Sequence, residues 1–217
     1  MLSRTQLNRH MKDVYIIDDV IWPGYADQIE DVLFTKNVAW KFFQDVAIPM
    51  EEIRKLGFTR LTPGIGASIL QDEPYYINKP LLDLTEPIVH NACAKLNMVC
   101  DRVVQARSFI TFPLREELRK DYDNIHVDLM YEHMVCLYYV NNVDGDTYLF
   151  EEQADELNRD KSTLEEKFKR NDFKVAMKVS PKKGRCLVFN GKRYHSSSGP
   201  TTGVRCIINF NFLAKNS

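Results

Sequence analysis

Short runs of β-branched, aromatic and aliphatic residues, separated by turn residues, recur through the second half of the chain. Such runs are typical of strands. The expected strands are residues 102–112, 133–142, 147–152, 173–180, 185–190 and 204–212. The turn signal NNVDGD follows the second of these runs and predicts a hairpin with the third. Many short strands with tight turns, preceded by helices, indicate a mainly β fold of the sandwich or jelly-roll type with supporting helices.

The first hundred residues have a mixed pattern. Residues 14–21 are expected to form a short strand, and Pro23 is expected to begin a helix, since proline fits the first helical position. Residues 80–97 predict a second helix, which Pro87 would kink. Residues 36–76 hold scattered aromatic residues, prolines and glycines, and we expect a long irregular segment of the kind that often shapes a binding site.

The pattern therefore favours one domain, in which residues 1–100 supply helical support and an irregular segment and residues 101–217 form the jelly-roll core. The charged run at 155–172 predicts a solvated helix or an inserted loop within that core. Both tryptophans, Trp22 and Trp40, are expected to lie in the hydrophobic interior.

Composition and charge narrow the function classes. A net charge of −1 gives no overall field that would attract nucleic acid or an anionic membrane, so neither is an expected partner. No apolar run is long enough to cross a bilayer, and the first residues lack the apolar core of a secretory signal. The five cysteines show no CxxC spacing and are most simply the buried thiols of a reducing cytosol. We expect a cytoplasmic protein and leave its oligomeric state open.

Candidate chemistry begins at the HVD triplet of residues 126–128. Residues i and i+2 of an extended segment point the same way, so an imidazole and a carboxylate converge there. A second histidine would complete a two-histidine, one-carboxylate set, which leaves the other positions of an octahedral iron open. His195, after the expected strand at 185–190, is the natural candidate, and His133 is the alternative. The triplet alone is weak, because an exposed loop histidine near an aspartate gives the same pattern.

A third element strengthens this interpretation. Arg205 begins an apolar strand ten residues after His195, and alternation places it on one face with Ile207, Asn209 and Asn211. An arginine that faces the interior needs an anion, because burying an unpaired charge is costly. The distal carboxylate of 2-oxoglutarate could be bound there by two N–H groups of one guanidinium. The alternative is an arginine at a strand edge that pairs with a surface acid.

The stretches IHVDLMYEHMVCLYYVNNVDGDTYLFEE and VSPKKGRCLVFNGKRYHSSSGPTTGVRCIINFNF resemble the prolyl-4-hydroxylase-like branch of the 2-oxoglutarate- and Fe(II)-dependent oxygenases, especially the small members encoded by cyanophages. The resemblance covers about residues 102–212, and the order HxD, YYVN, GxT, His and Arg is specific in combination. It implies a double-stranded β-helix, or jelly roll. It also implies a dioxygenase that uses Fe(II), 2-oxoglutarate and O2, with ascorbate as an optional reductant.

The resemblance further implies roles for individual residues. His126, Asp128 and His195 would hold the iron, and Arg205 would anchor 2-oxoglutarate. The hydroxyl of Tyr139 would bond the same carboxylate as Arg205, and a core tyrosine facing the other sheet is the alternative. Relatives that halogenate carry a small residue in place of the aspartate, so the carboxylate of Asp128 favours hydroxylation.

Two segments differ from the family pattern or are specific to this chain. The hairpin turn reads Gly145-Asp146-Thr147, where the family usually has two glycines, a variable residue and threonine. We expect this variation to leave the chemistry untouched. The charged segment at 115–124 is long and is interpreted as a loop on the substrate side, so the substrate is not transferred from any relative.

Three inward-facing polar residues are candidates for contact with the substrate. Arg107 shares a face with Gln105 and Phe109 by alternation, and it either binds a substrate carboxylate or makes a structural ion pair. Asn209 and Asn211 would offer hydrogen bonds in the same interior.

The expected function is 2-oxoglutarate- and Fe(II)-dependent hydroxylation of a peptidyl or free amino acid, with proline indicated by resemblance alone. One alternative is the same chemistry on a nucleobase or a small metabolite. Another is a non-catalytic jelly-roll protein that only binds a ligand. The intact ligand set together with Arg205 argues against that last class, because relic sites lose ligands.

Overall fold

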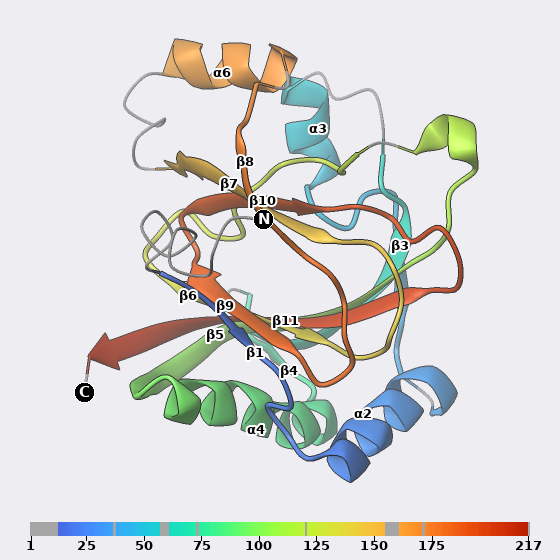
Figure 1. Cartoon of the computed structure of the whole chain (residues 1–217), viewed down its shortest axis with the longest axis vertical. Coiled ribbons are helices and arrows are strands. Elements are labelled where there is room, and N and C mark those ends of the chain that lie inside the picture. Colours follow the sequence, from blue (N-terminus) through green and yellow to red (C-terminus); the bar gives the residue numbers. More distant parts are fainter. Residues whose placement is uncertain are drawn as a thin grey trace, which may run out of the picture.

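Two β-sheets that face each other form the centre of the molecule (Figure 1). The structure, a computed structural model, describes residues 13–36, 38–56, 61–72, 74–119, 121–154, 161–170 and 172–216. The strands are β1 (Val14–Ile17), β2 (Lys41–Phe43), β3 (Gly64–Gln71), β4 (Tyr76–Ile77), β5 (Met98–Thr111), β6 (Met134–Tyr139), β7 (Thr147–Gln153), β8 (Val175–Val179), β9 (Cys186–Asn190), β10 (Arg193–Ser197) and β11 (Arg205–Asn216).

The larger sheet has eight strands in the order β1-β9-β6-β11-β5-β3-β2, with β4 paired to β3, and the smaller sheet has the order β10-β7-β8. All of these pairs are antiparallel. The helices are α2 (Pro23–Thr35), α3 (Met50–Leu56), α4 (Lys79–Lys95), the 3-10 turn η1 (Glu116–Leu118) and α6 (Lys161–Arg170). This arrangement is the jelly roll that the strand pattern and the resemblance predict.

Side-chain alternation along the strands separates two cores. Tyr139 of β6 lies in the core between the sheets, together with Leu149 of β7 and Phe189 of β9. Its neighbour Tyr138 points the other way, into the core that α2 and α4 cover. Figure 1 shows both helices on that outer side of the larger sheet. The larger sheet is therefore apolar on both faces, and polar side chains in its inner face need a reason.

Helix α2 shows how the local sequence produces this packing. It begins at Pro23, as predicted, and Ala26, Ile29 and Leu33 are its buried residues. Their spacing of three and four residues places them on one face of the helix. Helix α4 likewise follows prediction and runs without a break over Pro87.

The expected irregular segment at 36–76 is wrong for much of its length, because it contains β2, α3, β3 and β4. β3 lies inside the larger sheet between β5 and β2. Its glycines make the strand hard to recognise in the sequence, since glycine has a low strand propensity. A Cβ at Gly64 would lie 2.6 Å from the Ile110 carbonyl oxygen, and one at Gly66 would lie 2.9 Å from the Phe109 ring. Close packing therefore requires glycine at both positions.

The predicted hairpin between residues 133–142 and 147–152 is also wrong. Its two strands, β6 and β7, form as expected, but β6 pairs with β9 and β11 whereas β7 pairs with β8 and β10. The turn therefore carries the chain from one sheet to the other. A local turn signal cannot distinguish such a crossing from a hairpin, because strand partners are chosen by long-range packing.

Three further expectations concern single residues and membrane crossing. Trp22 is 71% exposed and caps the start of α2, so its assignment to the core is wrong, whereas Trp40 packs partly buried against the helix-covered core. All five cysteines are free. No helix within the described residues combines the length and apolarity needed to cross a membrane.

Candidate active site

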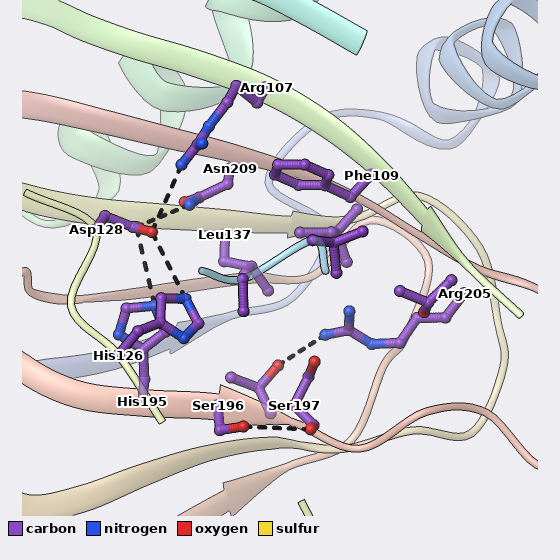
Figure 2. Close-up of a pocket in the computed structure, with 15 residues that line it drawn as sticks. Arg107, Phe109, His126, Asp128, Leu137, His195, Ser196, Ser197, Arg205 and Asn209 are labelled. Atoms are coloured by element: carbon purple, nitrogen blue, oxygen red, sulfur yellow. Dashed lines mark hydrogen bonds and ion pairs between the residues drawn. The ribbon is translucent and has the colours of Figure 1, made fainter. Parts of the chain in front are cut away.

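A pocket opens between the two sheets and collects most of the polar residues singled out from the sequence (Figure 2). The larger sheet contributes Arg107, Arg205 and Asn209 to its lining. His126 and Asp128 come from the segment that precedes β6, and His195 comes from β10 of the smaller sheet. The site therefore forms only when both sheets are in place.

The two histidines are held opposite each other by backbone pairing. His126 and His195 form an antiparallel bridge, in which each backbone N–H donates to the carbonyl oxygen of the other at 3.0 Å. Side chains of directly opposed residues lie on the same side of such a pair. The two imidazole centroids are accordingly 4.4 Å apart. The structure thus selects His195 as the second histidine.

Asp128 completes the group, as the i and i+2 spacing predicts. Its carboxylate oxygens lie 3.8 Å from Nε2 of His126 and 3.9 Å from Nε2 of His195. Val127, between them, turns the other way and packs against the cluster around Phe150. Among the described residues, these three form the one group of His, Cys, Asp or Glu side chains with ligand atoms so close together. The ligand atoms of the three residues all lie within 4.8 Å of one another, and two imidazoles with one carboxylate are the donor set that non-haem iron uses.

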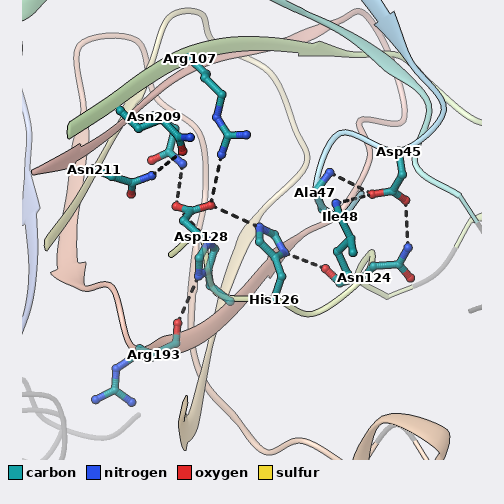
Figure 3. A network of polar contacts seen from close by, with 12 residues as sticks. Asp45, Ala47, Ile48, Arg107, Asn124, His126, Asp128, Arg193, Asn209 and Asn211 are labelled. Atoms are coloured by element: carbon teal, nitrogen blue, oxygen red, sulfur yellow. Dashed lines mark hydrogen bonds and ion pairs between the residues drawn. The ribbon is translucent and has the colours of Figure 1, made fainter. Parts of the chain in front are cut away.

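The hydrogen bonds of the two imidazole rings leave Nε2 of each ring free to bind a metal. Nδ1 of His126 lies 3.0 Å from the Asn124 carbonyl oxygen, and Nδ1 of His195 lies 3.2 Å from the Arg193 carbonyl oxygen (Figure 3). A carbonyl oxygen only accepts, so each Nδ1 must carry the proton. Nε2 of each neutral ring then has its lone pair free for a metal, which is the arrangement found at metal-ligating histidines.

Electrostatics keeps Asp128 and His195 in their ligating forms. Burial by itself would raise the pKa of Asp128, but His195, His126, Arg107 and the hydrogen bond from Asn209 outweigh it and hold that pKa well below its usual range. Burial, reinforced by the neighbouring His126, lowers the pKa of His195 to about 4. At neutral pH the site therefore presents a carboxylate and a neutral imidazole, as a dication requires.

Asn209 fixes the orientation of the carboxylate. Its Nδ2 donates to Oδ2 of Asp128 at 2.8 Å. Arg107 approaches the other oxygen, Oδ1, at 3.7 Å. Asn211, in contrast, does not line the pocket and donates to Gln105 at 3.0 Å. Arg107 and Asn209, two of the three residues suggested for substrate contact, therefore lie beside Asp128. Asn211, the third, does not line the pocket.

Arg205 is buried at 3% exposure and is preorganised by the turn that joins the sheets. Its Nε donates to the Gly145 carbonyl oxygen at 2.9 Å, and its Nη2 donates to the Thr147 hydroxyl at 3.0 Å. No carboxylate of the described residues pairs with it. Two of the five guanidinium N–H groups are used, which leaves three available to an anion in the pocket. The turn at 145–147 thus holds the arginine directly, through the backbone of Gly145 and through Thr147, which both match the family pattern.

Tyr139 does not line the pocket itself but contacts Thr147, which does. It is fully buried, and its hydroxyl donates to the Thr147 hydroxyl at 2.7 Å. Thr147 accepts from both Tyr139 and Arg205, so its own O–H remains to donate into the pocket, which it lines. Any effect of Tyr139 on a ligand carboxylate would therefore pass through Thr147 or through Arg205, whose Cζ lies 5.7 Å from the Tyr139 ring centroid.

His133, the alternative ligand, is placed elsewhere. Its Nδ1 lies 2.7 Å from the Tyr131 carbonyl oxygen, and its ring fills the space above Gly191, where a Cβ would lie 2.0 Å from Nε2. It is not part of the group of three ligands.

A polar network behind His126 was not anticipated from the sequence. Asp45, on the loop before α3, is 6% exposed. Its Oδ1 accepts from the backbone N–H groups of Ala47 and Ile48, each at 2.9 Å, and its Oδ2 accepts from Asn124 Nδ2 at 2.9 Å (Figure 3). Asn124 in turn holds the ring of His126 through its carbonyl oxygen. The Asp45 carboxylate therefore connects the pocket-lining loop to His126. In the sequence, the only sign of this role is an aspartate placed among apolar residues.

We expect Asp45→Ala to lower the free energy of unfolding by about 3 kcal/mol, because it leaves several buried donors without an acceptor. Thermal denaturation of the purified apoprotein measures this. Asp83→Ala, on the exposed side of α4 beside Lys79, is the matched control and should change stability by less than about 0.5 kcal/mol. Equal stability of the Asp45 variant and the control would contradict the structural role of the network.

Comparisons with known proteins locate this architecture among solved structures. No protein-family model matches the chain, and no curated protein matches it significantly in sequence. SnoN, a non-haem alpha-ketoglutarate-dependent epimerase from nogalamycin biosynthesis, is similar with a TM-score of 0.59 and 9% identity, over 97% of this chain and 82% of SnoN. HygX from Streptomyces hygroscopicus, solved with nickel and 2-oxoglutarate, is similar with a TM-score of 0.56 and 14% identity, over 98% of this chain and 87% of HygX.

A prolyl hydroxylase from Trichoplax adhaerens, solved with a hypoxia inducible factor peptide, has a TM-score of 0.53 and 18% identity, over 96% of this chain and 86% of that protein. These alignments cover nearly the whole chain at low identity, so they establish architecture. The chain has the double-stranded β-helix fold of the 2-oxoglutarate- and iron(II)-dependent oxygenases.

Proposed function

We propose that this protein is a 2-oxoglutarate- and Fe(II)-dependent dioxygenase that hydroxylates a C–H bond of a free or peptidyl amino acid. The observation that carries the proposal is the joint occurrence, in one pocket, of a two-histidine, one-aspartate group and a buried arginine that pairs with no carboxylate of the described residues. Either feature alone has a structural explanation. Together they match the needs of a metal dication and a dicarboxylate co-substrate.

Solved structures of this fold support the cofactor assignment. HygX holds nickel and 2-oxoglutarate, and a complex of SnoN holds Fe3+, alpha-ketoglutarate and nogalamycin RO. In the present chain, His126, Asp128 and His195 would hold the metal. Arg205 would bind the distal carboxylate of 2-oxoglutarate, with Thr147 donating a hydrogen bond beside it. When bound, Fe(II) with 2-oxoglutarate and O2 supplies an oxidant able to attack a C–H bond, with release of succinate and CO2.

The remaining pocket residues orient and shield this chemistry. Asn209 holds the Asp128 carboxylate in one orientation, and the backbone bridge holds both histidines. Leu137 and Ile207 are nearly buried and form an apolar wall of the pocket. Such a wall limits water around the reacting centre and strengthens the charge pairing of Arg205 with its ligand.

Solved proteins that share this fold catalyse different reactions. The prolyl hydroxylase with the same fold binds a peptide, which is in line with an amino acid target. SnoN is an epimerase with the same architecture, so the fold is compatible with outcomes other than hydroxylation. A nucleobase or small-metabolite oxygenase is therefore the second candidate, and a ligand-binding jelly roll without catalysis is the third.

Succinate formation separates these classes. Protein loaded with Fe(II) under anaerobic conditions and then given 2-oxoglutarate and O2 should release succinate, even as slow uncoupled turnover. Zn(II)-loaded protein is the control and should release none. A screen of amino acids, peptides and nucleosides by mass spectrometry then looks for one added oxygen. If the protein bound neither Fe(II) nor 2-oxoglutarate, the oxygenase proposal would fail.

A further inference from the structure

A second arginine, Arg107, lines the same pocket at a distance from Arg205, and its side chain is 29% exposed. Arg107 is opposite Asn209 in the β5–β11 pair, whereas Arg205 is opposite Thr111. Residues four apart on a strand are about 13 Å apart along its axis. Figure 2 shows Arg107 beside Asp128 and separated from Arg205 by Phe109 and Leu137. One ligand carboxylate cannot serve both guanidinium groups.

The Arg107 guanidinium has almost no protein partners. Its Nε is buried without a hydrogen-bond partner, and its terminal nitrogens make no hydrogen bond to any described residue. Among the described residues, its one charged contact is Oδ1 of Asp128 at 3.7 Å, which is longer than a hydrogen bond. Arg205, by comparison, makes two hydrogen bonds to the protein. A buried guanidinium N–H without an acceptor is costly, and a ligand in the pocket would supply that acceptor.

Asp128 does not need Arg107 for its orientation, because Asn209 already donates to its other oxygen at 2.8 Å. The charge of Asp128 is also required elsewhere, since it would be shared with the metal. A purely structural ion pair therefore explains Arg107 poorly. Phe109 lies under the guanidinium, with 5.2 Å from Cζ to the ring centroid, and keeps the planar group presented to the pocket.

Charge matching leads to the same conclusion. The metal dication and Arg205 together bring three positive charges to the pocket. Asp128 brings one negative charge and 2-oxoglutarate brings two, so these charges cancel. Arg107, whose side chain is 29% exposed, then adds one positive charge, and among the described residues no acidic one other than Asp128 lines the pocket. The loaded pocket is therefore complementary to a ligand that brings one further negative charge.

We propose that Arg107 is the substrate-recognition residue and that the substrate carries a free carboxylate, which binds the Arg107 guanidinium beside the metal group. The inference rests on the proposed function and refines it, because it favours a free amino acid over a residue within a peptide. An internal residue of a peptide has no backbone carboxylate to offer at this position.

Binding to a form that cannot turn over tests this directly. Protein loaded with Zn(II) and saturated with 2-oxoglutarate is titrated with the twenty standard L-amino acids and, for each, with its carboxamide. Saturation-transfer NMR detects the ligand, and calorimetry gives the dissociation constant. We expect at least one acid to bind and its carboxamide to bind about thirtyfold more weakly or worse, as for the loss of one buried charge pair.

Three variants make the test specific to Arg107. Arg107→Met should bind the acid as weakly as the wild type binds the carboxamide, and Arg107→Lys should keep part of the preference for the acid. Arg102→Met is the matched control on the same strand, since Arg102 is exposed and pairs with Asp72 outside the pocket. It should behave as the wild type. The 2-oxoglutarate affinity should stay within about twofold in all three.

Several results would overturn the inference. These are binding of no acid, equal binding of an acid and its carboxamide, or tight binding of peptides with blocked termini. A loss of 2-oxoglutarate affinity in Arg107→Met that matches the loss for the acid would instead assign Arg107 to the co-substrate. Failure of the wild type to bind 2-oxoglutarate at all would refute the proposed function, so the two failures are distinguishable.

Discussion

Asp128→Ala is expected to abolish succinate formation and to weaken metal binding by at least about a hundredfold. Substituting a group that merely supports a metal ligand typically costs ten- to a hundredfold in affinity, and Asp128 would be a ligand itself. It is also the one carboxylate of the three-residue group, so the site would lose charge matching for a dication. Metal content after dialysis, and succinate under saturating 2-oxoglutarate, measure the two effects.

The control for this prediction is Asp83→Ala, because Asp83 lies exposed on α4 and far from the pocket in the fold. It should retain wild-type metal content and activity. Thermal melting of the metal-free variants shows whether Asp128→Ala remains folded, since it leaves Arg107 without its charged neighbour. A folded Asp128→Ala protein with wild-type iron content and turnover would eliminate Asp128 as a ligand and with it the proposed site.

Arg205→Met is expected to weaken 2-oxoglutarate binding by about a hundredfold while leaving metal binding intact. The guanidinium is fully enclosed, and a buried charge-assisted pair to a carboxylate is typically worth a few kcal/mol. Methionine keeps much of the side-chain volume, so the packing around Gly145 should survive. Calorimetry with Zn(II)-loaded protein measures the affinity directly. Unchanged 2-oxoglutarate binding would remove Arg205 from the co-substrate site.

The hydrogen bonds around Arg205 predict a graded series. Thr147→Val removes the hydroxyl that lines the pocket and should weaken 2-oxoglutarate binding by about tenfold, the order of one hydrogen bond to a charged group. Tyr139→Phe removes only a donor to Thr147 and should cost about threefold or less. The reverse order would show that the Tyr139 hydroxyl contacts the co-substrate itself.

Much of the site could be predicted because its parts are local. The i and i+2 spacing of His126 and Asp128, and the alternation that places Arg205 and Asn209 on one face, depend on backbone geometry over a few residues. The start of α2 at Pro23 follows from the same kind of local rule. Patterns with a fixed period therefore predicted the right elements and the right faces.

Other features depend on partners that are distant in the chain. Whether His195 or His133 completes the group is decided by the bridge between residues 126 and 195, and the crossing of the turn between sheets is decided by the partners of β6 and β7. Strand pairing is selected by burial over the whole sheet, which no local pattern encodes. The glycines of β3 made an interior strand hard to recognise for the same reason, since the close neighbours that require them lie on other strands.

The chain's local pattern by itself thus determined the residue types of the site, their spacing and the faces they occupy, because periodicity acts over two to four residues. Only the tertiary structure decided which of these residues meet. It placed Gly145 and Thr147 beside Arg205 and connected Asp45 through Asn124 to His126. It also placed Arg107 beside Asp128, with no hydrogen-bond partner for its Nε among the described residues. Hydrogen bonding and desolvation act through space, and their partners are fixed only when both sheets close around the pocket.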